Sequence, residues 1–247
     1  MSKVLIIGDV HANLPGFRKA VQFASSNNMH LICVGDLIDN GNDGPAVTKM
    51  MLELVKQNKA SLIVGNHEWK IIRWIKGNDV KITPPNQITV DQMNNDSSFL
   101  ENFKELFEFT KDFIKLSDSI YITHAAVDKS FWNSNDVPTK KDLAVFKHGV
   151  SDTSKIYHYR GETYPIRVYD WVNDVPAGIK LFVGHDPRPM IGVPDFDNFQ
   201  SAPEVVTNDL GGTVTFLDCG SGKGGSLCGV VLNTVTNESE NFINFGN

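Results

Sequence analysis

The chain has 247 residues, of which 41% are hydrophobic and 21% are charged. This composition is typical of a globular protein with a sizeable buried core. The 23 basic and 29 acidic residues give a net charge of −6, so the chain as a whole does not attract nucleic acid. The three cysteines, Cys33, Cys219 and Cys228, contain no C-x-x-C pair. They indicate a reducing, cytoplasmic compartment, and no apolar run has the length of a membrane span.

Five short apolar segments predict β-strands that are buried on both faces. They cover residues 4–8, 31–35, 62–65, 120–124 and 181–184. Between the first three, apolar residues recur at helical spacing over residues 14–24 and 47–55, each with a proline near its start. The order strand, helix, strand, helix, strand predicts parallel pairing and an α/β sandwich.

The remaining segments are less regular. Residues 83–86 interrupt the chain with two prolines, and an amphipathic pattern over residues 99–113 predicts a further helix. Residues 127–176 are polar and aromatic, and we expect them to form loops and short helices of an inserted, cap-like segment. Residues 205–207, 213–217 and 227–235 predict antiparallel strands joined by turns. We expect one domain over residues 1–247.

Each of the five predicted strands ends at a side chain of a type that binds metals. These side chains are Asp9, His11, Asp36, Asn66, His124 and His185. Parallel strands bring their carboxyl ends to one edge of a sheet, so we expect these residues to converge there. Carboxylate, imidazole and amide groups favour Mn²⁺, with Fe, Zn or Ni as alternatives. Six ligands are too many for one catalytic ion, and they suit two ions that share a carboxylate.

Five motifs resemble those of the calcineurin-like metallophosphoesterases. They are Gly8-Asp9-x-His11, Gly35-Asp36-x-x-Asp39, Gly65-Asn66-His67-Glu68, His124 and Gly184-His185. The resemblance extends from Gly8 to about Gly225. It implies a four-layer α/β/β/α sandwich with two metal ions.

The resemblance also implies a role for each matching residue. Asp9, His11 and Asp36 would hold one ion, and Asp36 would bridge to a second ion held by Asn66, His124 and His185. His67 would act at the leaving group, and Asp39 would orient it. Asp218 would support the centre from behind the metal ligands.

Within the family, residues 67–78 and 161–185 are similar to the phosphatase domain of bacterial polynucleotide kinase-phosphatases. In the phosphoprotein phosphatases, arginines at two positions of the motifs clamp the phosphate. This chain departs from that pattern, because it has Asn40 and Val64 at those positions. The candidate substitutes for these arginines are Lys70, Arg73, Arg160, Arg167 and Arg188. For Lys70 and Arg73, a solvated helix face is the alternative interpretation.

Two other features of the sequence are candidate binding sites. Residues 220–225 fit G-x-G-x-x-G by letter, but a predicted strand follows instead of a helix, so we interpret them as a tight turn near the edge of the site. Tyr157, His158 and Tyr164 belong to an aromatic and basic cluster within the cap-like segment. This cluster either stacks on a nucleotide or packs an irregular lobe.

The sequence therefore predicts a metal-dependent phosphoesterase that hydrolyses phosphomonoesters and phosphodiesters, with nucleotides or RNA ends as substrates. The alternatives are a serine/threonine phosphoprotein phosphatase, a dinucleoside polyphosphate hydrolase and, in another class, a non-catalytic binding scaffold. A scaffold would have lost several site residues, and none is missing here. We expect two divalent ions, chiefly Mn²⁺, no membrane association and no obligate protein partner.

Overall fold

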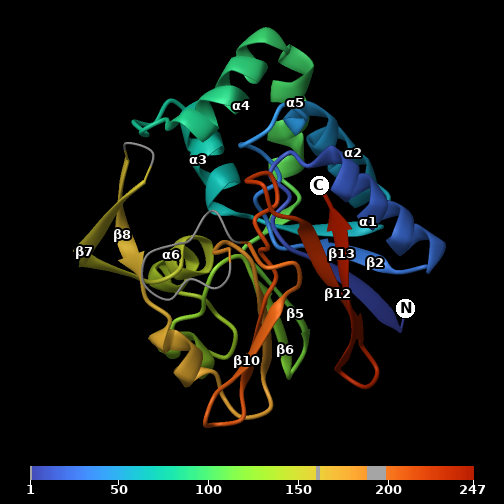
Figure 1. Ribbon diagram of the computed structural model, residues 1–247, viewed down its shortest axis with the longest axis vertical. Coiled ribbons are helices and arrows are strands. Elements are labelled where there is room, and N and C mark those ends of the chain that lie inside the picture. The colour runs from blue at the N-terminus through green and yellow to red at the C-terminus, as the bar shows by residue number, and fades with distance from the viewer. Residues whose placement is uncertain (1, 160–161, 188–198) are drawn as a thin grey trace.

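A computed structural model describes residues 2–159, 162–187 and 199–247. Two β-sheets lie face to face at the centre of the molecule (Figure 1). The first has the strand order β13 (Glu238–Gly246), β12 (Leu227–Asn233), β1 (Lys3–Ile7), β2 (His30–Cys33), β3 (Ala60–Ile63) and β4 (Thr110–Lys111). The second has the order β10 (Glu204–Thr207), β11 (Thr213–Phe216), β9 (Lys180–Val183), β6 (Ile120–Thr123) and β5 (Phe113–Ser117).

The five predicted strands are present and divide between the two sheets. β1, β2 and β3 pair in parallel, with Ile6 opposite Ile32 and Ile32 opposite Ser61. In the second sheet β6 and β9 are parallel, with Tyr121 opposite Leu181. Within each sheet these parallel strands place their carboxyl ends at one edge.

Alternate residues of each strand bury against different layers. On β1, Leu5 and Ile7 face the helices, whereas Val4 and Ile6 face the second sheet. Because both faces are covered, the strands read as continuous apolar runs. Each fully buried Leu or Ile contributes about 1.5–3 kcal/mol relative to exposure.

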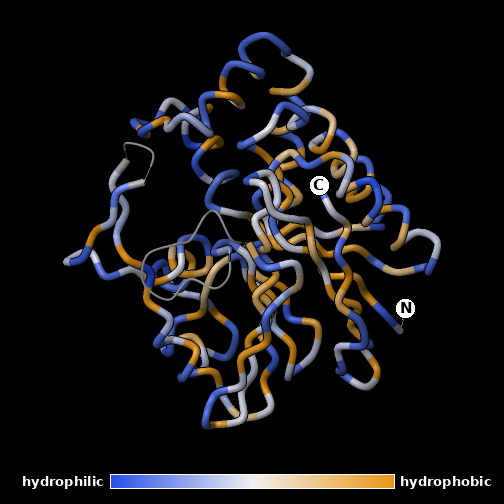
Figure 2. The backbone as a smooth tube through the Cα atoms, in the orientation of Figure 1, coloured by the Kyte–Doolittle hydropathy of each residue, from blue (hydrophilic) through white to orange (hydrophobic). Residues whose placement is uncertain are grey.

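Helices cover the outer face of each sheet. Over the first sheet lie α1 (Leu14–Ser26), α2 (Gly44–Lys56), α3 (Asn66–Ile75), α4 (Pro84–Asn95) and α5 (Ser97–Phe107). Over the second lie α6 (Lys140–His148) and the short 3₁₀ helices η1 (Lys129–Asn133) and η2 (Asp170–Asp174). The apolar residues gather between these layers (Figure 2). The expected four-layer α/β/β/α sandwich is confirmed.

The predicted helix over residues 99–113 is too long. α5 ends at Phe107, and the chain then forms β4, in which Thr110 pairs with Leu62. Phe113 belongs to β5 and packs edge-on against Phe131, with ring centroids 5.4 Å apart. The aromatic spacing imitated a helix because Phe113 continues it by chance across the turn.

Residues 127–176 are more regular than we expected. They contain a β-hairpin of β7 (Ser151–Tyr159) and β8 (Glu162–Arg167), with Asp152 opposite Ile166 and Tyr157 opposite Tyr164. Figure 1 shows this hairpin standing apart from the two central sheets. It carries no continuous apolar run because it does not join the core, and the sequence pattern therefore gave no strand signal.

The pairing predicted for the last strands is partly wrong. β10 and β11 are antiparallel, as expected, but β11 then runs parallel to β9 and does not pair with β12. β12 crosses to the first sheet and lies antiparallel to β1, with Val230 opposite Ile6. Within the described ranges, no helix combines the length and apolar character needed to cross a membrane.

Candidate metal centre and its pocket

Loops that follow the strands bring the six candidate metal ligands together. Asp9 and His11 follow β1, and Asp36 follows β2. Asn66 begins α3 after β3, while His124 and His185 follow β6 and β9 of the second sheet. The backbone N–H of His185 donates to both carboxylate oxygens of Asp9, at 3.0 and 3.1 Å, and this contact links the two sheets at the site.

The first group of candidate ligands consists of Asp9, His11 and Asp36. Nδ1 of His11 lies 3.0 Å from the carbonyl of Ile38. If this nitrogen carries the proton and donates it, the lone pair of Nε2 is directed into the site. His11 Nε2 lies 3.9 Å from Asp9 Oδ2 and 3.7 Å from Asp36 Oδ2. This nitrogen is buried and has no hydrogen-bond partner among the residues that the structure describes.

The second group is more closely spaced and consists of Asn66, His124 and His185. Asn66 Oδ1 lies 3.0 Å from His124 Nε2 and 2.9 Å from His185 Nδ1, and the two histidine nitrogens are 3.1 Å apart. Asp36 Oδ2 lies 3.5 Å from His124 Nε2. His124 Nδ1 lies 2.9 Å from the carbonyl of Val34, which holds the ring with Nε2 toward the site.

These distances fit two cations that share Asp36. Ligand atoms about 2.1 Å from one ion lie about 3 Å apart when they subtend a right angle. The second group has this spacing, and the orphaned Nε2 of His11 faces carboxylate oxygens with room for an ion between them. Asp36 Oδ2 lies within 3.7 Å of a nitrogen from each group, as a bridging ligand requires.

Burial and charge hold the site groups in states suited to bind cations. Burial lowers the pKa of His11 and of His185, so both imidazoles are neutral and keep a lone pair for a ligand bond. Burial raises the pKa of Asp9, and the nearby carboxylates of Asp218 and Asp36 raise it further. An acidic cluster of this kind gains stability when cations neutralise it.

His67, the second residue of α3, lies beside these groups and contacts Asp39. His67 Nδ1 lies 2.5 Å from Asp39 Oδ2, and its Nε2 lies 3.7 Å from Asp36 Oδ2. Asn86 Nδ2 and Thr89 Oγ1 of α4 also donate to Asp39, each at 2.5 Å. Burial lowers the pKa of His67, but Asp36 and Asp39 outweigh it and the pKa is raised, so the ring holds a proton that it can donate.

Glu68 holds the loop that carries Asp36. Its carboxylate accepts from the backbone N–H groups of Asp36, Leu37 and Gly65 at 2.8, 2.7 and 3.0 Å. Burial and the charge of Asp36 raise the pKa of Glu68 to about 7. Sequence analysis assigned Glu68 no role, although it is the last residue of the Gly65-Asn66-His67-Glu68 motif.

The backbone is strained at several candidate ligands. His11, Asp36 and His185 have φ values of 46°, 50° and 72°, in the left-handed region that non-glycine residues seldom occupy. Such strain gathers at functional sites, where the surrounding structure maintains it. At Gly184 a Cβ would lie 2.1 Å from Asp9 Oδ1, so glycine is needed for this close approach.

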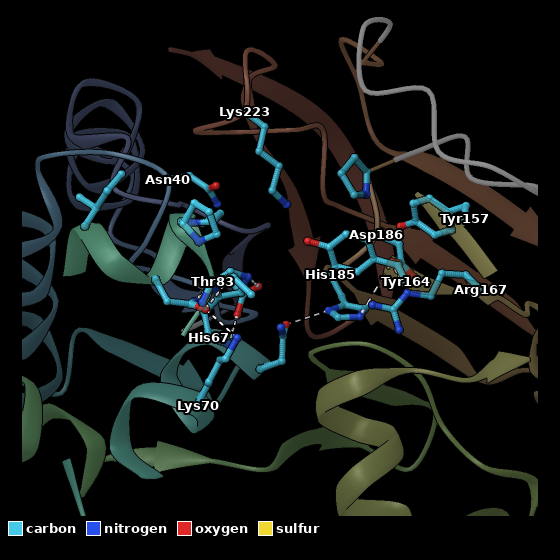
Figure 3. Close-up of a pocket in the computed structure, with 17 residues that line it drawn as sticks. Asn40, His67, Lys70, Thr83, Tyr157, Tyr164, Arg167, His185, Asp186 and Lys223 are labelled. Carbon is cyan, nitrogen blue, oxygen red and sulfur yellow. Dashed lines mark hydrogen bonds and ion pairs between the residues drawn. The ribbon is translucent and has the colours of Figure 1, made fainter. Parts of the chain in front are cut away.

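A cavity of about 440 Å³ opens onto the candidate metal centre (Figure 3). Its walls come from α3, the start of α4, the β7–β8 hairpin and the segment after β9. The side chains that line the cavity include His67, Lys70, Tyr157, Tyr164, Arg167 and Lys223. Tyr157 and Tyr164 stack on one another with ring centroids 5.5 Å apart and planes at 25°.

The predicted phosphate-binding residues differ in their placement. Lys70 and Arg167 line the cavity, where Lys70 Nζ donates to Asn86 Oδ1 at 2.6 Å and Arg167 Nε lies 3.2 Å from Asp186 Oδ1. Arg73 is exposed on α3 and does not line the cavity described here. The candidates Arg160 and Arg188 lie outside the described residues.

Asp218 lies behind the candidate ligands, close to a cation that sequence analysis missed. Its Oδ1 accepts from the backbone N–H of Gly220 at 2.8 Å, and its buried Oδ2 lies 3.8 Å from Lys223 Nζ. Burial lowers the pKa of Lys223, but Asp218 and Asp9 outweigh it and the pKa is raised. The only sequence signal for Lys223 was its place as a single basic residue within the glycine-rich residues 220–225.

A family model described as calcineurin-like phosphoesterase matches residues 2–211, which include all six candidate metal ligands. The chain belongs to the calcineurin-like phosphoesterase family. Members of this family are hydrolases of phosphate esters with a dinuclear divalent metal centre. This calcineurin-like phosphoesterase is therefore a metal-dependent enzyme, as the motifs predicted.

Two proteins similar in sequence carry the name bis(5'-nucleosyl)-tetraphosphatase. The asymmetrical bis(5'-nucleosyl)-tetraphosphatase PrpE of Oceanobacillus iheyensis is 28% identical over 201 residues, which cover 75% of this chain and 77% of the relative. The protein of the same name from Anoxybacillus flavithermus is 27% identical over 201 residues, which cover 68% of this chain and 81% of the relative.

Solved structures share the fold. A serine/threonine protein phosphatase from Saccharomyces cerevisiae superposes with a TM-score of 0.57 at 13% identity, covering 99% of this chain and 80% of that chain. At this level of identity the likeness concerns the fold alone.

Proposed function

We propose that this calcineurin-like phosphoesterase hydrolyses bis(5'-nucleosyl) tetraphosphates asymmetrically, to a nucleoside triphosphate and a nucleoside monophosphate. The observation that carries the proposal is the cavity, which joins the candidate metal centre to a pair of stacked tyrosines and several cations. The names of the bacterial relatives support the same substrate class.

The cavity suits a nucleotide with a polyphosphate chain. Its volume of about 440 Å³ lies within the range of small-molecule sites, about 300–1,000 Å³. Tyr157 and Tyr164 on the hairpin offer an aromatic surface for a base, and stacking on such a surface contributes about 1–3 kcal/mol per base. Lys70 and Arg167 line the same cavity and would face the phosphates.

In this proposal Asp9, His11 and Asp36 hold one ion, while Asp36, Asn66, His124 and His185 hold the other. Two bound divalent ions would supply a polarised phosphoryl group and a water of lowered pKa. The chain itself orders the substrate, because the side chains that line the cavity would hold the phosphates and the base.

His67 completes the chemistry at the leaving group. The oxygen of a water molecule bonds to the phosphorus, and the P–O bond to the leaving phosphate breaks. His67 Nε2 donates its proton to the leaving oxygen, while Asp39 keeps Nδ1 of the same ring in place. The water proton passes to solvent, and the imidazole regains its proton before the next cycle.

A substrate panel tests the proposal. The purified chain, supplied in turn with Mn²⁺, Fe²⁺, Zn²⁺ and Ni²⁺, is assayed on diadenosine tetraphosphate, a 2′,3′-cyclic nucleotide, an RNA 3′-phosphate, a phosphopeptide and an aryl phosphate. We expect the highest kcat/KM with diadenosine tetraphosphate and Mn²⁺, the products ATP and AMP, and no turnover by His124→Ala. A higher kcat/KM with the RNA end or the phosphopeptide would replace the dinucleotide by that substrate.

A further inference from the structure

A glycine-rich loop between β11 and β12 lies against the candidate metal centre. Ser221 Oγ donates to the carbonyl of Val10 at 2.9 Å and accepts from Asn13 Nδ2 at 3.1 Å, and all three residues are buried. At Gly222 the backbone φ is +70°, and a Cβ would lie 2.4 Å from the carbonyl oxygen of His11. The loop is therefore fixed directly on the segment that carries Asp9 and His11.

This loop presents Lys223 to the cavity. The backbone N–H groups of Lys223 and Gly225 both donate to the carbonyl of Gly220, at 3.0 and 2.9 Å, which closes a tight turn around the lysine. Figure 3 shows the side chain reaching into the cavity from the side opposite Lys70. Only 22% of the side chain is exposed, so its ammonium group is directed at the site rather than at bulk solvent.

The ammonium group of Lys223 is weakly engaged. Its nearest carboxylate oxygen, Asp218 Oδ2, is 3.8 Å away, beyond hydrogen-bond distance, and among the described residues its Nζ makes no hydrogen bond. Lys70 and Arg167, which also line the cavity, have closer partners. Lys70 donates to Asn86 at 2.6 Å, and Arg167 donates to the carbonyl of His148 at 2.6 Å.

A bound phosphate oxygen would have to displace hydrogen bonds at Lys70 and Arg167, whereas at Lys223 it would compete only with the longer ion pair to Asp218 among the described residues. Among the described residues no hydrogen bond uses the three N–H donors of the Lys223 ammonium, and the anchored loop holds the residue in place. Nearby carboxylates stabilise the charge of this cation, and a phosphate oxygen within reach would add a charged hydrogen bond. The cavity thus contains a positively charged hydrogen-bond donor, Lys223, beside the candidate metal centre.

We propose that Lys223 is a substrate-binding residue that contacts the phosphates of the polyphosphate chain next to the reacting one. The inference rests on the proposed function, because it needs a substrate with more than one phosphate. It assigns to a loop after β11 the cationic role that arginines fill in the phosphoprotein phosphatases, where this chain has Asn40 and Val64.

The test compares substrates of different charge in Lys223→Met, Lys223→Arg and the control Lys129→Met, whose side chain is 76% exposed on η1. With Lys223→Met we expect KM for diadenosine tetraphosphate to rise about 10- to 100-fold, as for loss of one charged hydrogen bond. We expect kcat/KM for bis(4-nitrophenyl) phosphate, which has no second phosphate, to change less than about threefold. Lys223→Arg should retain most of the affinity, and Lys129→Met should match the wild type.

Two further readouts separate a binding role from a structural one. Inhibition of bis(4-nitrophenyl) phosphate hydrolysis by inorganic tripolyphosphate, with Mn²⁺ in excess, should weaken in Lys223→Met by the same factor as KM rises. Metal content and Tm should stay at the wild-type values. An equal loss of activity on both substrates, a loss of metal, or unchanged tripolyphosphate inhibition would overturn the assignment. If Lys223→Met is insoluble, Lys223→Gln provides the same comparison.

The failure of this inference differs from failure of the proposed function. If the wild type hydrolyses aryl esters but not diadenosine tetraphosphate, the proposed substrate is wrong. The tripolyphosphate experiment then still decides whether Lys223 binds phosphate chains.

Discussion

Replacing Asp39 by asparagine removes a charge while keeping the shape of the side chain. Asp39 is fully buried and accepts from His67 Nδ1, Asn86 Nδ2 and Thr89 Oγ1, each at 2.5 Å. An asparagine oxygen can occupy the Oδ2 position, where it still accepts from His67 and Asn86. Its amide group then faces the Thr89 hydroxyl, which can turn and accept. Asp39→Asn therefore tests the charge on Asp39 rather than its hydrogen bonds.

The magnitude follows from the strength of the bond to His67. A hydrogen bond to a charged group contributes about 1.5–3 kcal/mol, compared with about 0.5–1.5 kcal/mol for a neutral one. When the His67 ring carries positive charge, Asp39→Asn should cost about 1–2 kcal/mol. This corresponds to a fall in kcat of about 5- to 30-fold, provided that His67 acts in the rate-limiting step.

The assay compares two aryl phosphates with good and poor leaving groups, 4-nitrophenyl and phenyl phosphate. If His67 protonates the leaving oxygen, Asp39→Asn should slow the phenyl ester more than the nitrophenyl ester, because the poorer leaving group needs the proton more. Thr89→Val is the matched control: it removes one donor to Asp39 and keeps the charge, and kcat should change less than about threefold. An equal loss on both esters would refute the assigned role of His67, and an unchanged kcat would refute that of Asp39.

Three further outcomes are expected. In Gly184→Ala the new Cβ would meet Asp9 Oδ1 at 2.1 Å, so metal content by plasma emission spectroscopy and kcat should both fall; full metal occupancy would contradict this. Chelation should abolish activity and lower Tm because the clustered carboxylates lose their counter-ions, and Mn²⁺ should restore both; a chelated sample with unchanged Tm would contradict it. Arg73→Ala should leave KM for diadenosine tetraphosphate within about twofold, because this exposed residue lies outside the cavity lining; a larger rise would return Arg73 to the phosphate-binding residues.

Much of the fold was predictable because its signals are local. β1, β6 and β9 are buried on both faces and read as unbroken apolar runs. The β7–β8 hairpin and β4 were not predictable in this way, since neither supplies such a run. β4 has two residues and exists because Thr110 can pair with Leu62 of β3.

The residue types that follow the buried strands were enough to predict the chemistry of the site. Asp9, Asp36 and His124 each follow a buried strand, and parallel strands must bring such positions to one edge of a sheet. The glycines beside them added the family resemblance. These properties require only residue type, spacing and the geometry of a strand, so they can be read without the tertiary structure.

The residues that line the cavity come together through tertiary contacts. Lys223 reaches the cavity because Ser221 bonds to Val10 across 211 positions of sequence, and Asn86 reaches Asp39 across 47 positions. Tyr157 and Tyr164 form a wall because an irregular segment folds into a hairpin. Contacts of this kind depend on how loops pack against distant strands, and no local pattern of hydrophobicity encodes that packing.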